Sequence, residues 1–341
     1  MKPPSSAQDS VVNHPVLAII KSMLRANPPA VSGIHNILGI NIDGERVLLV
    51  YGSHSGQVFE RVAFPPPTDE PFSSMLEALS TMADHLLSLT QAQRLPLPEK
   101  LSVSVSGNYD DDTGLLESAP DFPLWKLISL RSQLSLRFNL PAWVAKKADA
   151  GVMAEALFGS GQQARNLVFV SFNPTVRLGL IANGSLYRSA GGSSGDIGIQ
   201  PMPDERHPLA TINTFADASQ LVALGHDHFP GHWPKEISVY QMISDANSGD
   251  PYAIELFELA GARLGQGLAG AAHLLRPEVI IIGHPFCQLG PWFITALRES
   301  LEKNTGLNEA RLPHIAPSEL CDRLPELQAL APAIFAAHPA L

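Results

Sequence analysis

Regular patterning begins at Ile37, where short aliphatic runs alternate with turn residues. The stretch ILGINIDGERVLLVYGSHSGQV contains two such runs, and a third follows from Glu60 to Phe64, which together predict a β-meander. In PFSSMLEALSTMADHLLSLTQAQ the apolar residues recur at helical spacing, LSVSVSG alternates as a strand does, and LWKLISLRSQLSLRFNLP is again helical. The first half of the chain therefore predicts a meander, a helix, a strand and a helix.

A similar order returns in the second half. AWVAKK predicts a short strand that leads into the helix ADAGVMAEALFG, and NLVFVSFNPTVRLGLIANGSLYRS predicts a pair of strands. Asp250 and Pro251 form a favourable N-cap and first position for the long helix YAIELFELAGARLGQGLAGAAHLL, and PEVIIIG suits a buried strand. The doubled order predicts two lobes of related build.

Composition narrows the class of protein. With 341 residues, 45% of them hydrophobic and 16% charged, the chain can bury a large core and form two domains. Its net charge of -10 argues against a free-standing nucleic-acid binder. Cys287 and Cys321 are too few for a disulfide framework or a thiolate zinc site and favour a reducing compartment. Because no signal-peptide pattern and no run of about 18 apolar residues occurs, we expect a cytoplasmic protein without a membrane partner.

Residues 1–35 are predicted to be a polar tail with one short helix, from His14 to Asn27, which Pro28 and Pro29 end. A helix-turn-helix needs a second, groove-reading helix directly behind the first, whereas this chain continues into a strand. We therefore expect no direct DNA binding by an intact helix-turn-helix. A vestige of a lost DNA-binding domain is one interpretation of the helix.

Four blocks of sequence between about Ile37 and Leu301 resemble the ROK family, a group of bacterial sugar kinases and sugar-responsive repressors. They are SAPDFPLWK, ADAGVMAEALFGSGQQARNLVFV, SAGGSSGDIG and GDPYAIELFELAGARLGQGLAGAAHLLRPEVIIIG. The resemblance implies an α/β, actin-like (ribonuclease H-like, hexokinase-type) ATPase fold with two lobes, and a homodimer. The N-terminal lobe is expected over 36–141 together with about 320–341, where a helix from about Leu324 to Ala337 returns, and the C-terminal lobe over 142–319.

The phosphate-binding loops depart from the pattern of the ROK kinases. The family's D-I-G-G-T is here Asn41-Ile42-Asp43-Gly44-Glu45, so an amide replaces the metal-side acid and two carboxylates stand where phosphate would lie. The family's second loop, G-T-G-V-G-G-G, is here NPTVRLG, which keeps only Gly179 and fills the approach of phosphate to the backbone with side chains. The Gly-Gly pair on the adenine side is Gly283-His284. ATP and Mg²⁺ are therefore not expected as cofactors.

The catalytic base of the family is also replaced. The E-N-D-A-N segment uses its Asp to take the proton of the sugar hydroxyl, and that position is Lys147, preceded by Lys146. An ammonium group charged at neutral pH cannot accept this proton. Asp149 lies two positions further along the helix, where it would point elsewhere. We predict no catalytic residue.

The resemblance implies a structural zinc site, bound by a His after G-E-I-G and by a cysteine cluster. Here the His position is Ile199 and PMPDERHPLATINT contains no cysteine, so no zinc is expected. His226, His228 and His232 have H-x-H-x-x-x-H spacing with Asp227 between them, and we interpret them as solvated histidines of a loop.

Polar residues remain at the positions that bind sugar hydroxyls in the family, which are Asp121, Asp196 and Asn213 in this chain. Lys146 and Lys147 would stand near the hydroxyl that a kinase phosphorylates, where they would suit an anionic sugar such as a sugar 6-phosphate. The alternative is a decayed pocket in which Asp196 caps a turn and the lysines are solvated.

Three functions remain open at this point. The first is a non-catalytic sugar-sensing or transcription-regulatory protein, a pseudokinase that binds a sugar or sugar phosphate and acts through a regulatory protein partner. The second is an ATP-dependent hexose or amino-sugar kinase with a displaced base. The third is an interaction protein that uses the dimer surface of the family without any small ligand.

Overall fold

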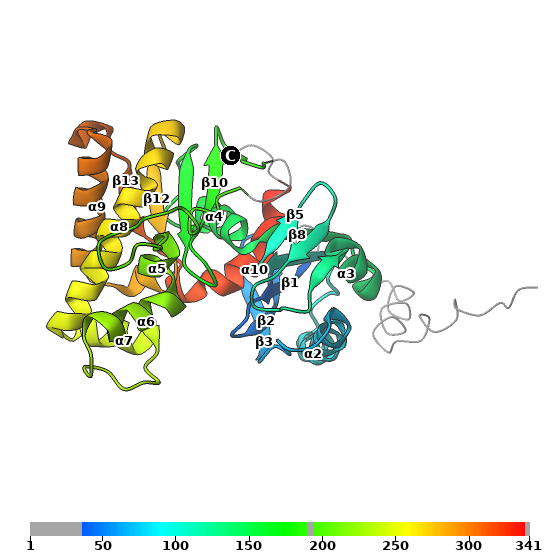
Figure 1. Ribbon diagram of the computed structural model, residues 1–341. Helices are drawn as coiled ribbons and strands as arrows, with labels where there is room; N and C mark the ends of the chain where they lie inside the picture. The colour runs from blue at the N-terminus through cyan, green and yellow to red at the C-terminus, as the bar shows by residue number, and fades with distance from the viewer. Residues whose placement is uncertain (1–35, 190–193, 338–341) are drawn as a thin grey trace, which may run out of the picture.

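The computed structural model describes residues 36–189 and 194–337, so the helix predicted from His14 to Asn27 lies outside the described residues. Two lobes lie side by side, each built around its own five-stranded sheet (Figure 1). A smaller three-stranded sheet belongs to the N-terminal lobe and consists of β5 (Asn108–Asp110), β6 (Leu115–Ser118) and β7 (Lys126–Ile128).

The sheet of the N-terminal lobe has the strand order β3-β2-β1-β4-β8. Its first three strands form the predicted antiparallel meander, and β4 and β8 continue the sheet in parallel. The strands are β1 (Asn36–Ile42), β2 (Val47–Ser53), β3 (Val58–Phe64), β4 (Lys100–Val105) and β8 (Ala142–Lys146).

Helices cover both faces of this sheet because successive residues of β1 point to opposite sides. Leu38 and Ile40 pack with α2 (Phe72–Ala92) and α3 (Leu130–Phe138). Ile37 packs with α10 (Leu324–Phe335) on the other face. The C-terminal helix thus lies against the first lobe, as Figure 1 shows in red.

The chain crosses from the first lobe to the second at a later residue than we predicted. The boundary was expected near Pro141, but β8 pairs in parallel with β4 from Ala142 to Lys146 and so completes the first sheet. Helix α4 (Lys147–Phe158) follows at once and packs against α10 as well as against two strands of the second sheet. The junction of β8 and α4 therefore lies between the lobes.

The sheet of the C-terminal lobe has the order β11-β10-β9-β12-β13. Its strands are β9 (Leu167–Ser171), β10 (Arg177–Ala182), β11 (Ser185–Leu186), β12 (Val279–Ile282) and β13 (His314–Pro317). Its helices are α5 (Ile212–Ala216), α6 (Ala218–His228), α7 (Val239–Asn247), α8 (Pro251–Leu275) and α9 (Pro291–Thr305). Asp250 caps α8 as predicted, since its Oδ1 accepts a hydrogen bond of 2.8 Å from the Ala253 amide.

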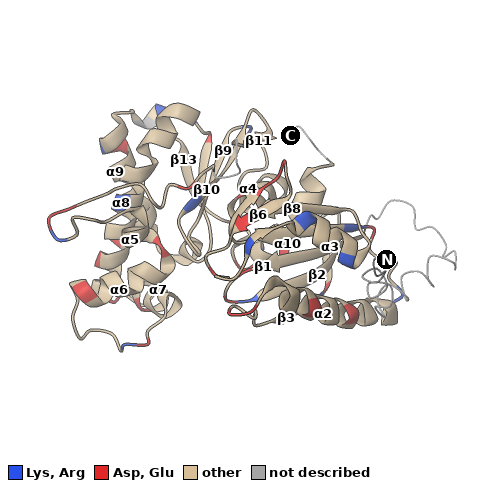
Figure 2. Cartoon of the chain, turned by 45° about the vertical axis from the view of Figure 1, so that its right-hand side comes forward, with Lys and Arg blue, Asp and Glu red and all other residues tan. Residues whose placement is uncertain are grey.

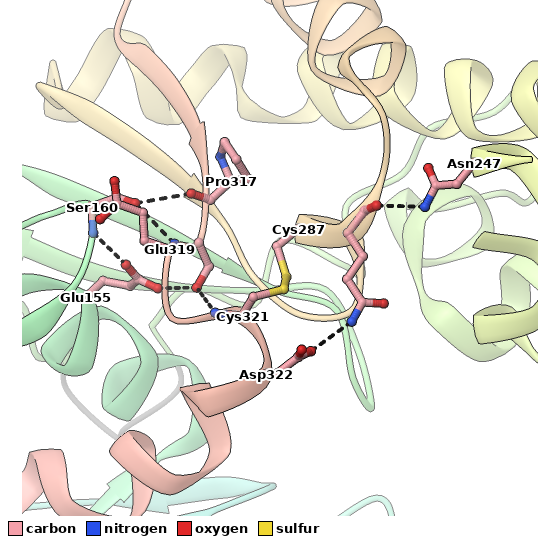
Figure 3. Close-up of a disulfide and its surroundings, with 10 residues drawn as sticks. Glu155, Ser160, Asn247, Cys287, Pro317, Glu319, Cys321 and Asp322 are labelled. Carbon is pink, nitrogen blue, oxygen red and sulfur yellow. Dashed lines mark hydrogen bonds between the residues drawn. A yellow bond between two sulfur atoms is a disulfide. The ribbon is translucent and has the colours of Figure 1, made fainter. Parts of the chain in front are cut away.

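Cys287 and Cys321 form a disulfide, which corrects our interpretation of the two cysteines (Figure 3). Cys287 lies in the 3₁₀ turn η2 (Phe286–Gln288) after β12, and Cys321 in the turn η4 (Cys321–Arg323) before α10. Their Cα atoms are 6.2 Å apart although 34 positions separate them in the sequence. Gln288 Nε2 donates to Asp322 Oδ1 over 3.0 Å between the same turns. Only the tertiary structure brings these turns together.

Charged side chains are spread over both lobes. Figure 2 shows Lys and Arg scattered among the acidic residues in that view, without one strongly basic element. In the described part of the chain, no helix combines the length and the apolar character needed to cross a membrane.

Candidate ligand site between the lobes

A cleft of about 360 Å³ lies between the two lobes. Both sheets and the intervening helices contribute to it. Its polar and charged lining residues are Asn41, Asp43, Glu45, Arg46, Lys147, Ser171, Asn173, Tyr240, His284 and Gln328.

Lys147 opens α4, and its ammonium group forms an ion pair with Asp43 from the turn after β1. Both side chains are largely buried, with 17% and 14% of their surface exposed. Burial raises the pKa of the Asp43 carboxyl, but the Lys147 ammonium outweighs this effect, so the pKa lies below its usual value. Gln328 Nε2 donates to the Lys147 carbonyl over 3.0 Å and so fixes the start of the helix. The ion pair therefore holds Lys147, the residue at the predicted base position, against Asp43.

The two loops that correspond to the phosphate loops of the family are bonded to one another. Asn173 Nδ2 donates to Glu45 Oε1 over 3.3 Å, and the Tyr240 hydroxyl donates to Glu45 Oε2 over 3.3 Å. Burial and the nearby Glu45 carboxylate raise the pKa of the Tyr240 phenol, so it remains a donor. Side chains therefore occupy the space in which glycine backbone would approach a phosphate.

Arg177 connects the lobes on the other side of the site. Its Nη1 lies 3.3 Å from the Gly107 carbonyl oxygen at the end of β4, and its Nη2 lies 3.2 Å from Asp196 Oδ2. The predicted sugar ligand Asp196 is therefore already paired through one carboxylate oxygen.

Asp121 lies against the turn that carries Asp43. A Cβ atom on Gly44 would overlap the Asp121 side chain, so the turn needs a glycine there. Burial and the negative charge of Asp43 raise the pKa of the Asp121 carboxyl, although Lys147 acts in the opposite direction. The structure thus brings two predicted site residues, Asp121 and Lys147, close to the same turn.

Lys146 and Lys147 do not share a site, in contrast to our prediction. Lys146 Nζ lies 3.1 Å from Ser194 Oγ and 3.5 Å from Asp149 Oδ2. It lines a separate small cavity with Tyr109, Asp149 and Arg188, whereas Lys147 lines the cleft between the lobes. The reason is that consecutive residues at a strand-to-helix junction point in different directions.

Asn213, the third predicted sugar ligand, is bonded within the C-terminal lobe. Its Oδ1 accepts a hydrogen bond of 2.9 Å from the Val176 amide, and the side chain packs on Gly198, where a Cβ atom would overlap it. The residue is buried. Its geometry suits holding the two loops that carry Val176 and Gly198 rather than binding a ligand.

Several buried oxygen atoms around the ends of β1 and β4 have no hydrogen-bond partner in the described part of the chain. They are Asn41 Oδ1, Ser104 Oγ, Asn108 Oδ1, Asp121 Oδ2 and Asp196 Oδ1. Asn41 and Ser104 are register partners on adjacent strands, and Asn108 follows the glycine that Arg177 contacts. Buried polar atoms usually have a hydrogen-bond partner. These unpaired oxygen atoms are therefore suited to accept hydrogen bonds from a ligand that carries several hydroxyl groups.

The residues at the implied zinc and Mg-ATP positions do not fit those groups. Ile199, at the expected zinc-binding His position, is apolar and 65% exposed, and the following loop has no cysteine. Asp43 and Glu45 are committed to Lys147, Asn173 and Tyr240 rather than open to a metal-bound phosphate.

Comparisons with known proteins agree with this fold. The sequence model of the ROK family matches residues 37–323. A xylose repressor of Caldicellulosiruptor bescii is 24% identical over 320 residues, which cover 87% of this chain and 78% of the repressor. A glucokinase of Halalkalibacterium halodurans is 20% identical over 281 residues, covering 78% and 84% of the two chains.

Solved structures give the same fold. The ROK glucokinase of Streptomyces griseus in complex with glucose and AMPPNP superposes with a TM-score of 0.72 at 19% identity, over 87% of this chain and 99% of the glucokinase. A ROK transcriptional regulator, a homologue of the Escherichia coli MLC protein, gives a TM-score of 0.72 at 19% identity, over 88% and 78% of the two chains. These matches define an actin-like, two-lobed α/β protein, as predicted. The chain belongs to the ROK family.

Sequence reasoning missed Tyr240 and the partners of Arg177. The replacement of a loop glycine by Arg177 was a visible signal, because a long cation in a phosphate loop needs a nearby acceptor. Tyr240 lies on α7, outside the four blocks that resemble the family, and nothing in the sequence indicated it.

Proposed function

We propose that this chain is a non-catalytic regulatory protein of the ROK family that senses a sugar between its lobes. The observation that carries the proposal is the ion pair of Lys147 with Asp43, which places a paired ammonium at the position of the general base. The bond from Asn173 to Glu45 adds support, because it joins the loops that would have to receive ATP. The similarity to both repressors and glucokinases is consistent with a sugar-related role.

A sugar with free hydroxyl groups fits the site better than a sugar phosphate. Lys147 in the cleft and Arg177 beside it each contact a carboxylate already, and Arg46, the other cation of the lining, is exposed to solvent. The unpartnered oxygen atoms of Asn41, Asp121 and Asp196 can instead accept hydrogen bonds from sugar hydroxyls. We therefore prefer a neutral ligand to the anionic sugar that the two lysines suggested.

Ligand binding would act through the arrangement of the lobes. Because the acceptors come from both lobes, a bound sugar would favour the conformation in which they converge. The size of this shift depends on how much more tightly the sugar binds that conformation than the other one. We further propose that the protein acts in the cytoplasm as a homodimer and passes this change to a regulatory protein partner.

Thermal denaturation of the purified chain tests the proposal. The panel contains hexoses, amino sugars, their 6-phosphates, sugar acids and Mg-ATP, each added to the wild type, to Asp121→Ala and to Asp69→Ala, a control at an exposed aspartate. A ligand at 100 times its dissociation constant stabilises the folded state by about 2.7 kcal/mol. We expect a rise in melting temperature with a neutral sugar, retained in Asp69→Ala and lost in Asp121→Ala.

Other outcomes point to the other functions. A rise with Mg-ATP together with phosphate transfer to a sugar would establish a kinase and overturn the proposal. A rise with 6-phosphates alone would retain the sensor and replace the neutral ligand by an anionic one. Absence of any shift across the panel would favour a protein that interacts without a small ligand.

A further inference from the structure

Three metal-ligating side chains converge in the C-terminal lobe, away from the cleft. His207 lies in the loop before α5, and Asp227 and His228 are the last two residues of α6. One donor atom of each lies within 4.8 Å of the other two. We propose that His207, Asp227 and His228 form a binding site for a divalent transition-metal ion with the ligand preferences of zinc.

The hydrogen bonds of His207 orient one of its nitrogens for metal binding. Asp204 Oδ1 accepts from the His207 amide over 2.7 Å and lies 3.2 Å from His207 Nδ1. Arg263 Nη2 lies 2.6 Å from Asp204 Oδ2, which favours the ionised carboxylate. A carboxylate can only accept, so Nδ1 carries the proton and Nε2 is left with its lone pair.

This lone pair faces a second acceptor. His207 Nε2 lies 3.3 Å from Asp227 Oδ2. Two acceptors at this distance repel unless a cation lies with them, either a second proton on His207 or a metal ion. The separation matches the edge of a tetrahedron around a zinc ion, which is about 3.3 Å for bonds of about 2.0 Å.

His228 completes the set of ligands. Its ring is nearly parallel to that of His207, with an angle of 13° and a centroid separation of 5.4 Å. Two imidazoles bound to one tetrahedral ion have centroids about 5 Å apart, which is close to this separation. Because each imidazole holds a metal ion in the plane of its own ring, one of the two near-parallel rings must turn for both to bind the same ion. Its Nδ1 lies 3.2 Å from the Leu224 carbonyl oxygen and 3.9 Å from Asp227 Oδ2, so this nitrogen either donates to Leu224 or turns toward an ion beside Asp227.

The chemistry of the site indicates its ion. Two imidazoles and one carboxylate form an N₂O set that suits zinc and similar ions rather than magnesium or calcium. The Asp227 side chain is 67% exposed, so an ion can enter from solvent and keep a water as its fourth ligand. Bound there, it would tie the loop that carries His207 to α6.

The site differs from the histidine group that the sequence spacing suggested. His232 Nε2 lies 3.0 Å from Asp250 Oδ2 at the start of α8 and is not part of the cluster. His232→Ala therefore serves as a matched control, because it removes a histidine of the same spacing motif but none of the three ligands.

Isothermal titration of the chelator-treated full chain with Zn²⁺ tests the proposal. We expect one ion per chain, with at least tenfold weaker binding in His207→Ala and in His228→Ala and unchanged binding in His232→Ala. Asp204→Asn, which removes the carboxylate that positions His207 and that also pairs with Arg263, should weaken binding about tenfold. Melting curves without metal establish that each variant is folded.

Substitution with Co²⁺ gives a second readout, a visible absorption band of a four-coordinate ion that His207→Ala should abolish. No binding of Zn²⁺ would overturn the proposal and leave a protonated His207 as the cation beside Asp227. Binding that persists in His207→Ala, or that is lost in His232→Ala, would overturn it as well.

Discussion

At the scale of single residues, a few charged side chains at the lobe junction determine the chemistry of the cleft. Lys147 is paired with Asp43, and Arg177 is paired with Asp196. Each pair joins a position that aligns with a phosphate loop of the family to a position that aligns with its sugar or base site. The charged side chains at these positions therefore bind one another.

Replacing Lys147 by Met should destabilise the protein by about 3 kcal/mol at pH 7, because it leaves the buried Asp43 carboxylate without its cation. Urea unfolding measures this loss. The double variant Asp43→Asn/Lys147→Met should recover most of it, since no buried charge then lacks a partner.

The loss should depend on pH in a defined direction. In the wild type the lowered pKa of Asp43 stabilises the fold above its unfolded pKa, and this contribution disappears as the pH falls through the folded value. In Lys147→Met, protonation at low pH relieves the unpaired carboxyl. The difference between the two proteins should therefore shrink from pH 7 to pH 4, and an undiminished difference would show that the ion pair is not its source.

Asp149 should produce the opposite pH dependence. Burial raises the pKa of its carboxyl from 3.8 to about 6, against the effect of Lys146. The folded state then binds this proton more tightly than the unfolded state does. The contribution of Asp149 to stability therefore falls as the pH rises from about 4 to about 6, by about 3 kcal/mol at most. Unfolding of Asp149→Asn between pH 4 and pH 7 should lack this fall, and a profile parallel to the wild type would contradict the assignment.

At the scale of elements, α4 occupies the central position because both lobes pack against it. Its start follows directly on β8, and its backbone approaches β10 so closely that Gly179 cannot carry a side chain. Gly179 is the one glycine that the second phosphate loop retains, and here its role is close packing against the Ala148 carbonyl. The motif suggested that this glycine lies near a phosphate. Its contact with Ala148 joins segments distant in sequence, so the motif alone could not show the packing role.

Two single glycine-to-alanine substitutions should distinguish the effect of close packing from the effect of intrinsic helix propensity. Gly179→Ala should lower the free energy of unfolding by about 2 kcal/mol or more, because the new Cβ would overlap the backbone of Ala148. Gly270→Ala, on the exposed face of α8 with no atom near its Cβ position, should raise it by about 1 kcal/mol. Equal effects in chemical denaturation would contradict this account of Gly179.

At the scale of the whole molecule, the two lobes are connected by side chains as well as by the chain. Arg177 of β10 reaches the Gly107 carbonyl oxygen of the N-terminal lobe, and Asn173 donates a hydrogen bond to Glu45 across the cleft. The disulfide joins the turn after β12 to the turn before α10, and both turns border the cleft through His284 and Leu324 (Figure 3). The buried Glu155 accepts hydrogen bonds from Ser160 and Ser318 beside it.

Removing the disulfide should destabilise the fold. Chain entropy for a loop of this length predicts a loss of about 2 to 4 kcal/mol in the variant Cys287→Ser/Cys321→Ser. A reducing agent should cause a similar loss in the wild type and none in the variant, as measured by chemical denaturation. Wild-type stability that does not respond to the reducing agent would show that the two thiols are unpaired in solution.

Most of the elements, the two lobes and the departures from the family's kinase motifs could be predicted from the amino-acid pattern alone. Hydrophobic periodicity is a local property, and the residue at a motif position, such as Lys147, can be read without the fold. The tertiary structure decided which groups meet, because the partners are distant in sequence: 104 positions separate Asp43 from Lys147. It alone separated Lys146 from Lys147, paired the cysteines, and placed His207 beside Asp227 and His228.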